Sequence, residues 1–317
     1  MAHAVIERFK ALDSAFHARA NRSERLAARF AALASINSEH DIDAHIERSF
    51  ELRQKLNERL GAFRAPSSTM RLVYAAALAS ADRSAKDFFL MRAALASTRK
   101  QRGGRALSQG GSVAALALTV TRGDLDQTGR FFDTLEAVKA PWWRREATRE
   151  EVLAATTTAL GETPVTAQAR LSQARDTLSA AGVPRSHAEA AAYEVAWLAP
   201  DPGELASAWT VLNTAVRGRG ELRHGLGKTG LAILAAQGPG HATADALVDS
   251  FETVRALKPK ATGQVAARIA MRLAQAQIGQ TGPIAAARDL AAILAAQAAM
   301  IAAVTASTTA ATVAATS

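Results

Sequence analysis

Short turns interrupt the helical pattern of this 317-residue sequence at nearly constant intervals. Each turn contains Gly, Pro or Asp, and one residue from each serves as its marker: Asp82, Gly123, Gly161, Asp201, Gly238 and Gly279. The successive markers are 41, 38, 40, 37 and 41 residues apart. A period of this length is typical of two-helix repeats, which stack because one hairpin cannot bury its apolar face alone. The sequence therefore predicts a stack of about six helical hairpins.

The residues that flank the turns predict an all-α fold. A helix of small residues precedes each turn, as at 74–79, and a helix with larger apolar anchors follows it, as with Phe88, Met91 and Leu95. Hydrophobic residues make up 49% of the chain, but aromatic residues make up only 5%. Alanine is the main hydrophobic residue. Alanine favours helices over strands. In its period alone the predicted α-solenoid resembles the HEAT-like class.

The first 66 residues lie outside this period. Residues 5–20, 23–35 and 41–63 have the pattern of charged amphipathic helices, and the last of them ends at a loop around Pro66. We therefore expect two parts in the chain. Residues 1–66 form an N-terminal helical cap or module, and residues 67–317 form the helical-hairpin repeat domain.

The C-terminal segment has no charged residue between Leu290 and Ser317. Within it, the larger side chains recur at spacings of three and four, which places them on one stripe of a helix and alanine on the rest. The stripe comprises Leu290, Ile293, Leu294, Gln297, Met300, Ile301 and Val304. This pattern favours a buried or capping helix. A short membrane anchor is the alternative, although a span is usually richer in leucine.

The absence of cysteine excludes disulfides, thiolate metal sites and cysteine nucleophiles. At the N-terminus, Glu7, Arg8 and Lys10 interrupt the apolar stretch that a signal peptide would need. We therefore expect a cytoplasmic protein.

One cluster contains residue types that bind metals, namely His40, Asp41 and His45. On a helix that begins near Asp41, the side chains of Asp41 and His45 share a face. Helix capping by Ser38 or Asp41 accounts for the same residues, and we favour it. The expectation is no bound metal and no cofactor.

The sequence nominates no catalytic residue. Residues 225–229, Gly-Leu-Gly-Lys-Thr, resemble part of a phosphate-binding loop, but position 222 is Leu where the full pattern requires Gly. The glycines near Ser108 and Ser112 lack the spacing of a nucleophile elbow. The balance favours a protein without enzymatic activity.

Basic residues concentrate in the links between the predicted hairpins, whereas the turns within hairpins contain Asp and Glu. Equivalent loops of a solenoid lie along one edge, so we expect a basic edge and a more acidic opposite edge. Trp142 and Trp143 add aromatic surface for base stacking or membrane contact. The candidate anion-binding residues are Arg99, Lys100, Arg102, Arg105, Lys139, Trp142, Trp143, Arg144, Arg145, Arg217, Arg219, Arg223 and Lys228.

The formal net charge of +9 and the pI near 10.4 suit an anionic partner. A basic edge attracts nucleic acid, an anionic membrane surface or an acidic protein. A purely structural interpretation also exists. Lys and Arg near helix C-termini complement the helix dipole, and the tryptophans then fill a gap between hairpins.

Residues 291–303, together with the preceding hairpin series, are similar to a bacterial helical family that is catalogued only as a domain of unknown function. The likeness covers most of residues 70–317. It implies a bacterial helical-repeat architecture and brings no activity, cofactor or site residue with it.

Three functional hypotheses follow. The first is a non-enzymatic binding or scaffold protein whose basic edge meets an acidic or phosphate-bearing partner. The second is an enzyme with a site in the solenoid groove, such as a HEAT-like nucleic-acid base-excision enzyme, which requires a carboxylate near Trp142 and Trp143. The third is a peripheral membrane protein that is attached through its basic edge and uncharged C-terminus.

Overall fold

The structure is a computed structural model that describes residues 2–61, 65–140 and 146–278. The regular structure of these residues is entirely helical, with fourteen α-helices and three short 3-10 helices. The predicted all-α fold is confirmed.

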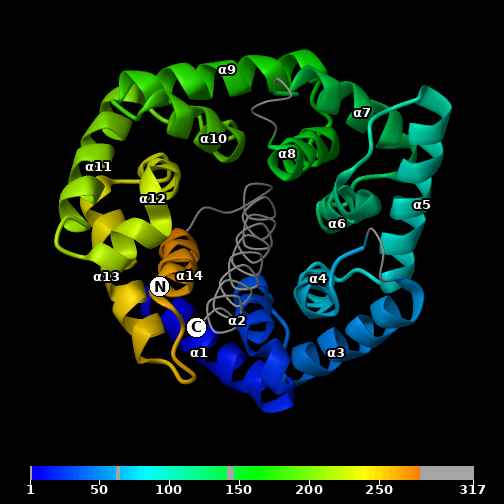
Figure 1. Cartoon of the computed structure of the whole chain (residues 1–317), viewed down its shortest axis with the longest axis horizontal. Coiled ribbons are helices and arrows are strands. Elements are labelled where there is room, and N and C mark those ends of the chain that lie inside the picture. The colour runs from blue at the N-terminus through cyan, green and yellow to red at the C-terminus, as the bar shows by residue number, and fades with distance from the viewer. Residues whose placement is uncertain (1, 62–64, 141–145, 279–317) are drawn as a thin grey trace, which may run out of the picture.

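The helices lie in two concentric layers (Figure 1). The outer layer consists of α1 (Ala2–Arg19), α3 (Ile42–Arg59), α5 (Ala85–Arg102), α7 (Thr128–Ala137), α9 (Pro164–Ala180), α11 (Pro202–Ala215) and α13 (Gly240–Ala256). The inner layer consists of α2 (Arg25–Ala34), α4 (Ser68–Ser80), α6 (Ser112–Val120), α8 (Ala147–Ala159), α10 (Arg185–Val195), α12 (Gly220–Ala235) and α14 (Gly263–Gln277). Each outer helix packs against the inner helix that follows it, so the described chain forms seven outer–inner pairs.

The last pair returns to the first and closes the ring. Helix α14 contacts both α1 and α2, and Arg29 Nη1 on α2 donates a hydrogen bond of 3.0 Å to the carbonyl oxygen of Pro259, before α14. The N-terminal helices α1 to α3 therefore pack as members of the ring (Figure 1). The finer expectation of a HEAT-like solenoid of about six repeats is not confirmed. The division into a cap and a repeat domain stays a prediction.

Because outer and inner helices alternate along the chain, the two faces of the ring carry different sets of loops. Because the chain passes from outer to inner and back to outer throughout, the inner helices all run in one direction and the outer helices run in the other. All loops from an outer to an inner helix consequently lie on one face of the ring. The loops from an inner to the next outer helix lie on the opposite face.

Small residues allow the inner helices to pack closely. Those that are fully buried include Ala75, Ala76, Ala114, Ala115, Ala154, Ala155, Ala191, Ala192, Ala232, Ala266, Ala267 and Ala270. One close approach joins α12 to α14, where a Cβ added at Gly225 would lie 2.5 Å from the Cβ of Ala267. The larger anchors lie on the outer helices, such as Phe88 and Phe131, which are also fully buried. The small-residue helices of the sequence pattern are thus the inner layer.

Polar side chains begin many of the helices. Hydroxyl or carboxylate oxygens of the N-cap residue accept hydrogen bonds from backbone N–H groups of the first turn, as N-caps commonly do. These residues are Asp41, Ser67, Ser84, Thr163, Asp201 and Thr262. Pro164 and Pro202 occupy the first helical position, where the missing N–H is not needed.

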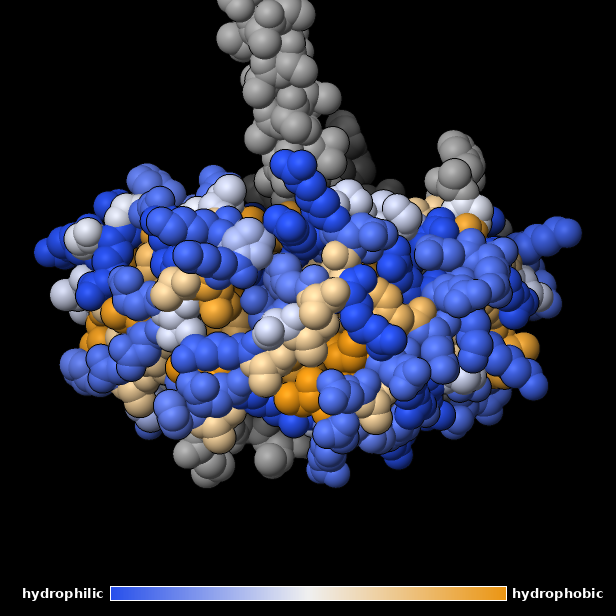
Figure 2. Space-filling view, turned by 90° about the horizontal axis from the view of Figure 1, so that it is seen from below, coloured by the Kyte–Doolittle hydropathy of each residue, from blue (hydrophilic) through white to orange (hydrophobic). Residues whose placement is uncertain are grey.

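The side of the ring that Figure 2 shows is largely hydrophilic. The view in Figure 2 shows hydrophilic residues over most of the visible described surface, with smaller hydrophobic areas among them. Within the described residues, every helix is too short or too polar to cross a membrane.

The close packing of α12 on α14 predicts that replacing glycine by alanine has opposite effects on stability at two positions, one on α12 and one on α7. Gly225→Ala places a methyl group against Ala267 and the backbone of Gln264, and we expect a loss of about 1–3 kcal/mol in the free energy of unfolding. Gly129→Ala on α7 meets no atom within 4 Å, and we expect a gain of about 0.5–1 kcal/mol from helix propensity. Urea unfolding followed by circular dichroism measures both changes. Equal effects at the two positions would contradict the packing.

Candidate anion-binding site

The two faces of the ring differ in the charge of their loops. Within the described residues, the outer-to-inner loops contain the cations Arg22, Arg105, Lys139, Arg217, Arg219, Lys258 and Lys260 and the anions Glu24 and Glu146. The inner-to-outer loops contain the anions Glu39, Asp41, Asp82, Asp124, Asp126, Glu162 and Asp201 and the cations Arg83 and Arg122. We name these faces the basic face and the acidic face.

A cavity of about 760 Å³ opens on the basic face where the ring closes. This volume is in the usual range of small-molecule sites. We name it the seam cavity, and it is lined by His17, Arg22, Ser23, Arg25, Leu26, Arg29, Glu221, His224, Pro259, Lys260, Ala261, Thr262, Gly263, Gln264, Val265 and Arg268. These residues come from the last turn of α1, the α1–α2 connection, the N-terminal halves of α2, α12 and α14, and the α13–α14 loop, so ring closure assembles the cavity.

Most of the charged groups in the seam cavity are cationic. Among these cations, Arg29 has a carboxylate partner: its Nε and Nη2 donate hydrogen bonds to the Asp13 carboxylate at 3.0 and 3.2 Å. The anionic Glu221 pairs with Arg255 at 3.2 Å. The remaining cations have no carboxylate partner within the described residues. They are Arg22, Arg25, Lys260 and Arg268.

Arg268 stands next to further positive charge. Burial, and then repulsion from Arg149 and Arg272, lower the pKa of the Arg268 guanidinium. Glu194 lies between those two arginines, at 2.8 Å from Arg272 and 3.5 Å from Arg149. Burial raises the pKa of Glu194, but Arg272 and Arg149 outweigh that effect and keep it below the usual value. An anion bound at Arg268 would therefore relieve repulsion as well as gain a hydrogen-bond partner.

The N-terminus of α14 contributes to the same cavity. Thr262 caps this helix through a hydrogen bond of 3.4 Å from Val265 N–H, and Gly263 and Gln264 follow on the cavity wall. The first turn of α14 contains no acidic residue to neutralise the positive end of the helix dipole. The 15-residue helix therefore adds a favourable field for an anion at this position.

A histidine on the cavity wall is held by a buried aspartate. His17 Nδ1 donates to the backbone carbonyl oxygen of Asp13 at 2.7 Å and lies 3.3 Å from the Asp13 carboxylate. A carbonyl oxygen only accepts, so Nδ1 holds the proton and Nε2 makes no hydrogen bond within the described residues. Burial raises the pKa of Asp13, but hydrogen bonds from His17 and Arg29 outweigh it and hold the pKa below its usual value.

Several cations that the sequence analysis proposed lie on the basic face but outside the seam cavity. Arg99, Lys100 and Arg102 occupy the last turn of α5, and Arg105 lies in the loop that follows. Arg99 lines a second, smaller cavity of about 380 Å³ between α5 and residues 106–111. Lys139 follows the C-terminus of α7.

Some of these side chains already have anionic partners. Arg105 Nη2 lies 2.6 Å from Oε2 of the fully buried Glu150, Arg102 lies 2.8 Å from Asp133, and Lys139 lies 2.7 Å from Glu136. For Arg105 in particular, the buried pair indicates a structural role. The surface of the α5–α6 loop is therefore less basic than its sequence suggests.

The structure separates Lys228 from the three candidate arginines that precede it in the sequence. Arg217 and Arg219 occupy the α11–α12 loop, and Arg223 lies in the first turn of α12 on the same face. Lys228 instead lies in the middle of α12, directly after Gly227, whose φ of 62° and ψ of −179° interrupt the helix. The Gly-Leu-Gly-Lys-Thr stretch is thus part of an interrupted helix.

Two sets of expectations fall outside the described residues. One comprises Trp142, Trp143, Arg144 and Arg145. The other is the uncharged segment from Leu290 to Ser317.

The His40, Asp41 and His45 pattern has a structural explanation. Asp41 caps α3 by accepting hydrogen bonds from Asp43 and Ala44 N–H. His45 is buried, and its ring nitrogens lie 2.7 Å from Ser35 Oγ and 3.2 Å from Ser38 Oγ. His40 lies on the surface, 2.8 Å from Asp82. Within the described residues, no three His, Asp or Glu side chains are grouped so as to hold a metal ion.

The seam cavity was not predicted from the sequence, because residues 1–66 were expected to form an N-terminal cap or module outside the repeats. A signal was present, since Asp41 lies 41 residues before Asp82, the same step as from Asp82 to Gly123 and from Gly238 to Gly279. A period extended by this step to the N-terminal helices would have predicted that Arg22 and Arg25 lie on the same face as the later basic links. Arg268 and His17 lie on helix faces and had no sequence signal of their own.

Comparisons with protein-family models, curated proteins and solved structures gave no match. The resemblance to a bacterial domain family stays a prediction.

The environment of His45 predicts a pH dependence of stability. Burial, followed by the charges of His40, Arg8 and Arg48, lowers the pKa of His45 from 6.5 to about 4. Between these values the unfolded chain binds a proton that the folded protein does not, so the free energy of unfolding should fall as pH drops from 6.5 towards 4. In His45→Asn this dependence should be weaker. Chemical unfolding across the window measures it, with the exposed His3→Asn as control, and unchanged pH dependence in His45→Asn would contradict the assignment.

Proposed function

We propose that this protein binds a phosphate-bearing partner through its basic face, without enzymatic activity, and that the seam cavity receives a phosphate group of that partner. The observation that supports this most strongly is the set of four cations in the cavity that have no carboxylate partner within the described residues. Four such charges around one cavity repel one another unless an anion joins them.

Two further features favour the same proposal. The loops of the basic face surround the cavity with charge of one sign, which attracts an anion over a distance set by ionic strength. The closed ring of packed helices places these loops on one face, as a scaffold for an extended partner requires. We also propose that the helix pairs are repeats with a HEAT-like period and that the protein acts in the cytoplasm.

A nucleic acid is the first probe because it offers many phosphates at regular spacing. An acidic protein offers carboxylates instead, and a membrane surface offers phosphates in two dimensions. Neither alternative accounts as directly for a concave site that holds one compact anion.

The Asp13–His17 contact favours a second candidate, hydrolysis of a phosphate ester in the seam cavity. Because His17 Nε2 is buried, the reaction requires a shift of the cavity wall that exposes it to water. Nε2 then takes a proton from the water that attacks phosphorus, the bond between phosphorus and the ester oxygen breaks, and the alcohol leaves as its anion. The neighbouring cations stabilise charge on the phosphate oxygens. The base-excision hypothesis depends on Trp142 and Trp143 and remains a separate proposal, as does membrane attachment.

The binding proposal predicts a clear difference between matched double variants. Arg25→Gln with Lys260→Gln removes two charges from the seam cavity, and Arg83→Gln with Arg122→Gln removes two from the acidic face. Fluorescence anisotropy with labelled single- and double-stranded oligonucleotides should show about tenfold weaker binding for the first variant and a salt dependence whose slope is smaller by about one to two. The second variant should bind like the unmodified protein.

Equal weakening in both double variants would show that only net charge matters and would contradict a site at the seam. No binding at low salt would reject nucleic acid as the partner. Acidic peptides and anionic vesicles would then be the next probes.

If the seam cavity hydrolyses phosphate esters, the protein should release p-nitrophenol from p-nitrophenyl phosphate or from bis(p-nitrophenyl) phosphate. His17→Gln should reduce the rate at least about 100-fold, because it removes the base, while oligonucleotide binding persists. Residual hydrolysis equal to that of the unmodified protein would reject His17 as a base. Absence of hydrolysis in the unmodified protein would leave binding as the function.

A further inference from the structure

A second cavity lies on the basic face, within the third outer–inner pair of the ring. It has a volume of about 380 Å³ and lies between α5 and the loop that leads to α6. Arg92, Ala96 and Arg99 follow one another at spacings of four and three, so they share one face of α5 and form one wall. Loop residues 106, 107 and 109–111 form the other wall. We name it the loop cavity, and it shares no lining residue with the seam cavity.

Two positive charges in the loop cavity are not neutralised by the protein. Within the described residues, neither Arg92 nor Arg99 has a carboxylate partner, and Nε of Arg92 is buried without a hydrogen-bond acceptor. The neighbouring cations differ, because Arg102 and Arg105 each pair with a carboxylate. An anion in the cavity would offset the repulsion between the two arginines and supply an acceptor for the buried donor.

The loop wall has a backbone conformation that a non-glycine residue adopts only under constraint. Gln109 and the two glycines after it all have positive φ, of 49°, 64° and 85°. The Tyr74 hydroxyl on α4 donates a hydrogen bond of 3.0 Å to Gln109 Oε1. The N–H of Ser108 donates one of 2.6 Å to Oε1 of Glu151, which is fully buried on α8. Strain that the surrounding structure imposes in this way is typical of ligand-binding sites.

The N-terminus of α6 borders the same cavity. Gly111 is the N-cap of this nine-residue helix and has no side chain to accept hydrogen bonds from the N–H groups of the first turn. The first turn contains no acidic residue, so no side-chain charge neutralises the positive end of the helix dipole there. Ser112 begins the helix, is fully buried, and has an Oγ without a hydrogen-bond partner within the described residues.

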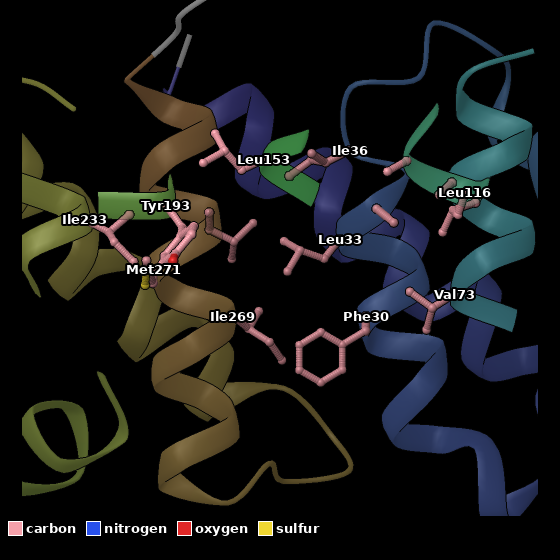
Figure 3. Close-up of a cluster of buried hydrophobic side chains, with 14 of the residues drawn as sticks. Phe30, Leu33, Ile36, Val73, Leu116, Leu153, Tyr193, Ile233, Ile269 and Met271 are labelled. Carbon is pink, nitrogen blue, oxygen red and sulfur yellow. The ribbon is translucent and has the colours of Figure 1, made fainter. Parts of the chain in front are cut away.

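Apolar packing holds α6 in place. Leu116 of α6 and Val73 of α4 lie in one cluster of buried hydrophobic side chains (Figure 3). Because α6 also packs against α5 and α8, several helices hold its N-terminus at the cavity. The two arginines, the loop and the helix end therefore form a cationic cavity that exists before a ligand arrives.

A phosphate group matches this cavity in charge, geometry and size. Each guanidinium presents forked N–H donors that fit pairs of phosphate oxygens. Helix N-termini bind phosphate through their backbone N–H groups and their dipole. A volume of about 380 Å³ is at the lower end of the range of small-molecule sites and admits a phosphate with a small organic group attached.

We propose that the loop cavity is a second phosphate-binding site, in which Arg92 and Arg99 pair with the phosphate oxygens beside the N-terminus of α6. The phosphate belongs either to a free small molecule or to an extended partner of the basic face. The inference does not depend on the seam cavity, because the two cavities share no lining residue.

The absence of cysteine from the chain allows a direct test by thiol protection. Ala96→Cys places a thiol between the two arginines, and Ser97→Cys places one at the next, exposed position of α5, turned about 100° away. We expect inorganic phosphate, titrated at constant ionic strength, to slow alkylation by iodoacetamide about tenfold at position 96 and not at position 97. Equal rates at position 96 throughout the titration would overturn the proposal.

Charge-removing variants locate the protecting anion. In the Ala96→Cys protein, Arg92→Gln with Arg99→Gln should abolish the protection, whereas the seam variant Arg25→Gln with Lys260→Gln should leave it unchanged. Circular dichroism checks that both variants fold, and the phosphate titration tests the proposal without them. Protection that persists without the two loop-cavity arginines, or that is lost in the seam variant, would overturn the proposal.

Two further ligands distinguish the sources of the phosphate. If an extended partner supplies it, a single-stranded oligonucleotide should protect position 96 at a concentration about 100-fold below that of inorganic phosphate, because other contacts of the basic face add to its affinity. If a small molecule supplies it, glycerol phosphate should protect position 96 and the oligonucleotide should not. Protection by inorganic phosphate alone, or by none of the three ligands, would overturn the proposal.

Discussion

Contact of α14 with α1 and α2 is the interaction on which the other features of the structure depend. An open stack of helical hairpins leaves two end faces that need separate capping, whereas a ring buries each against the other. Arg29 strengthens this junction because it pairs with Asp13 and also donates to the Pro259 carbonyl oxygen. Loss of one member of such a buried pair typically costs about 3–5 kcal/mol, so the junction depends on both.

Ring closure together with the alternation of layers also explains the electrostatics. Since the inner helices all run in one direction, their positive dipole ends lie on the basic face, among the basic loops. The outer helices run in the opposite direction, which limits the total dipole of the ring. At the junction, α14 presents its N-terminus beside Arg25, Lys260 and Arg268. The cavity is therefore the place where helix dipole, basic loops and concave shape coincide.

The sequence predicted those parts of the structure that follow from local patterns. Alanine content and the 40-residue period indicated an all-α fold of paired helices, and the distribution of Asp and Arg among the loops indicated two unlike faces. Ring closure was not predicted. It requires each of the seven helix pairs to be rotated by about 51° on average relative to the preceding pair. Such a rotation depends on details of packing, for example the contact of Gly225 with Ala267.

The candidate site depended on closure and was missed for that reason. His17 and Arg268 are 251 residues apart in the sequence, and no local pattern joins them. Arg105 shows the converse limitation, since the sequence presents it as a surface cation and the structure pairs it with the buried Glu150. A residue type near a helix end indicates charge, whereas only the tertiary packing shows whether that charge is already neutralised.

Hydrogen exchange measured by mass spectrometry, with and without inorganic tripolyphosphate, tests the central claim most directly. We expect the anion to protect the α1–α2 connection and residues 257–265 together, although they are distant in sequence, and to leave the loops of the acidic face unchanged. Protection on the acidic face, or at neither of the two segments, would contradict a phosphate site at the closure of the ring.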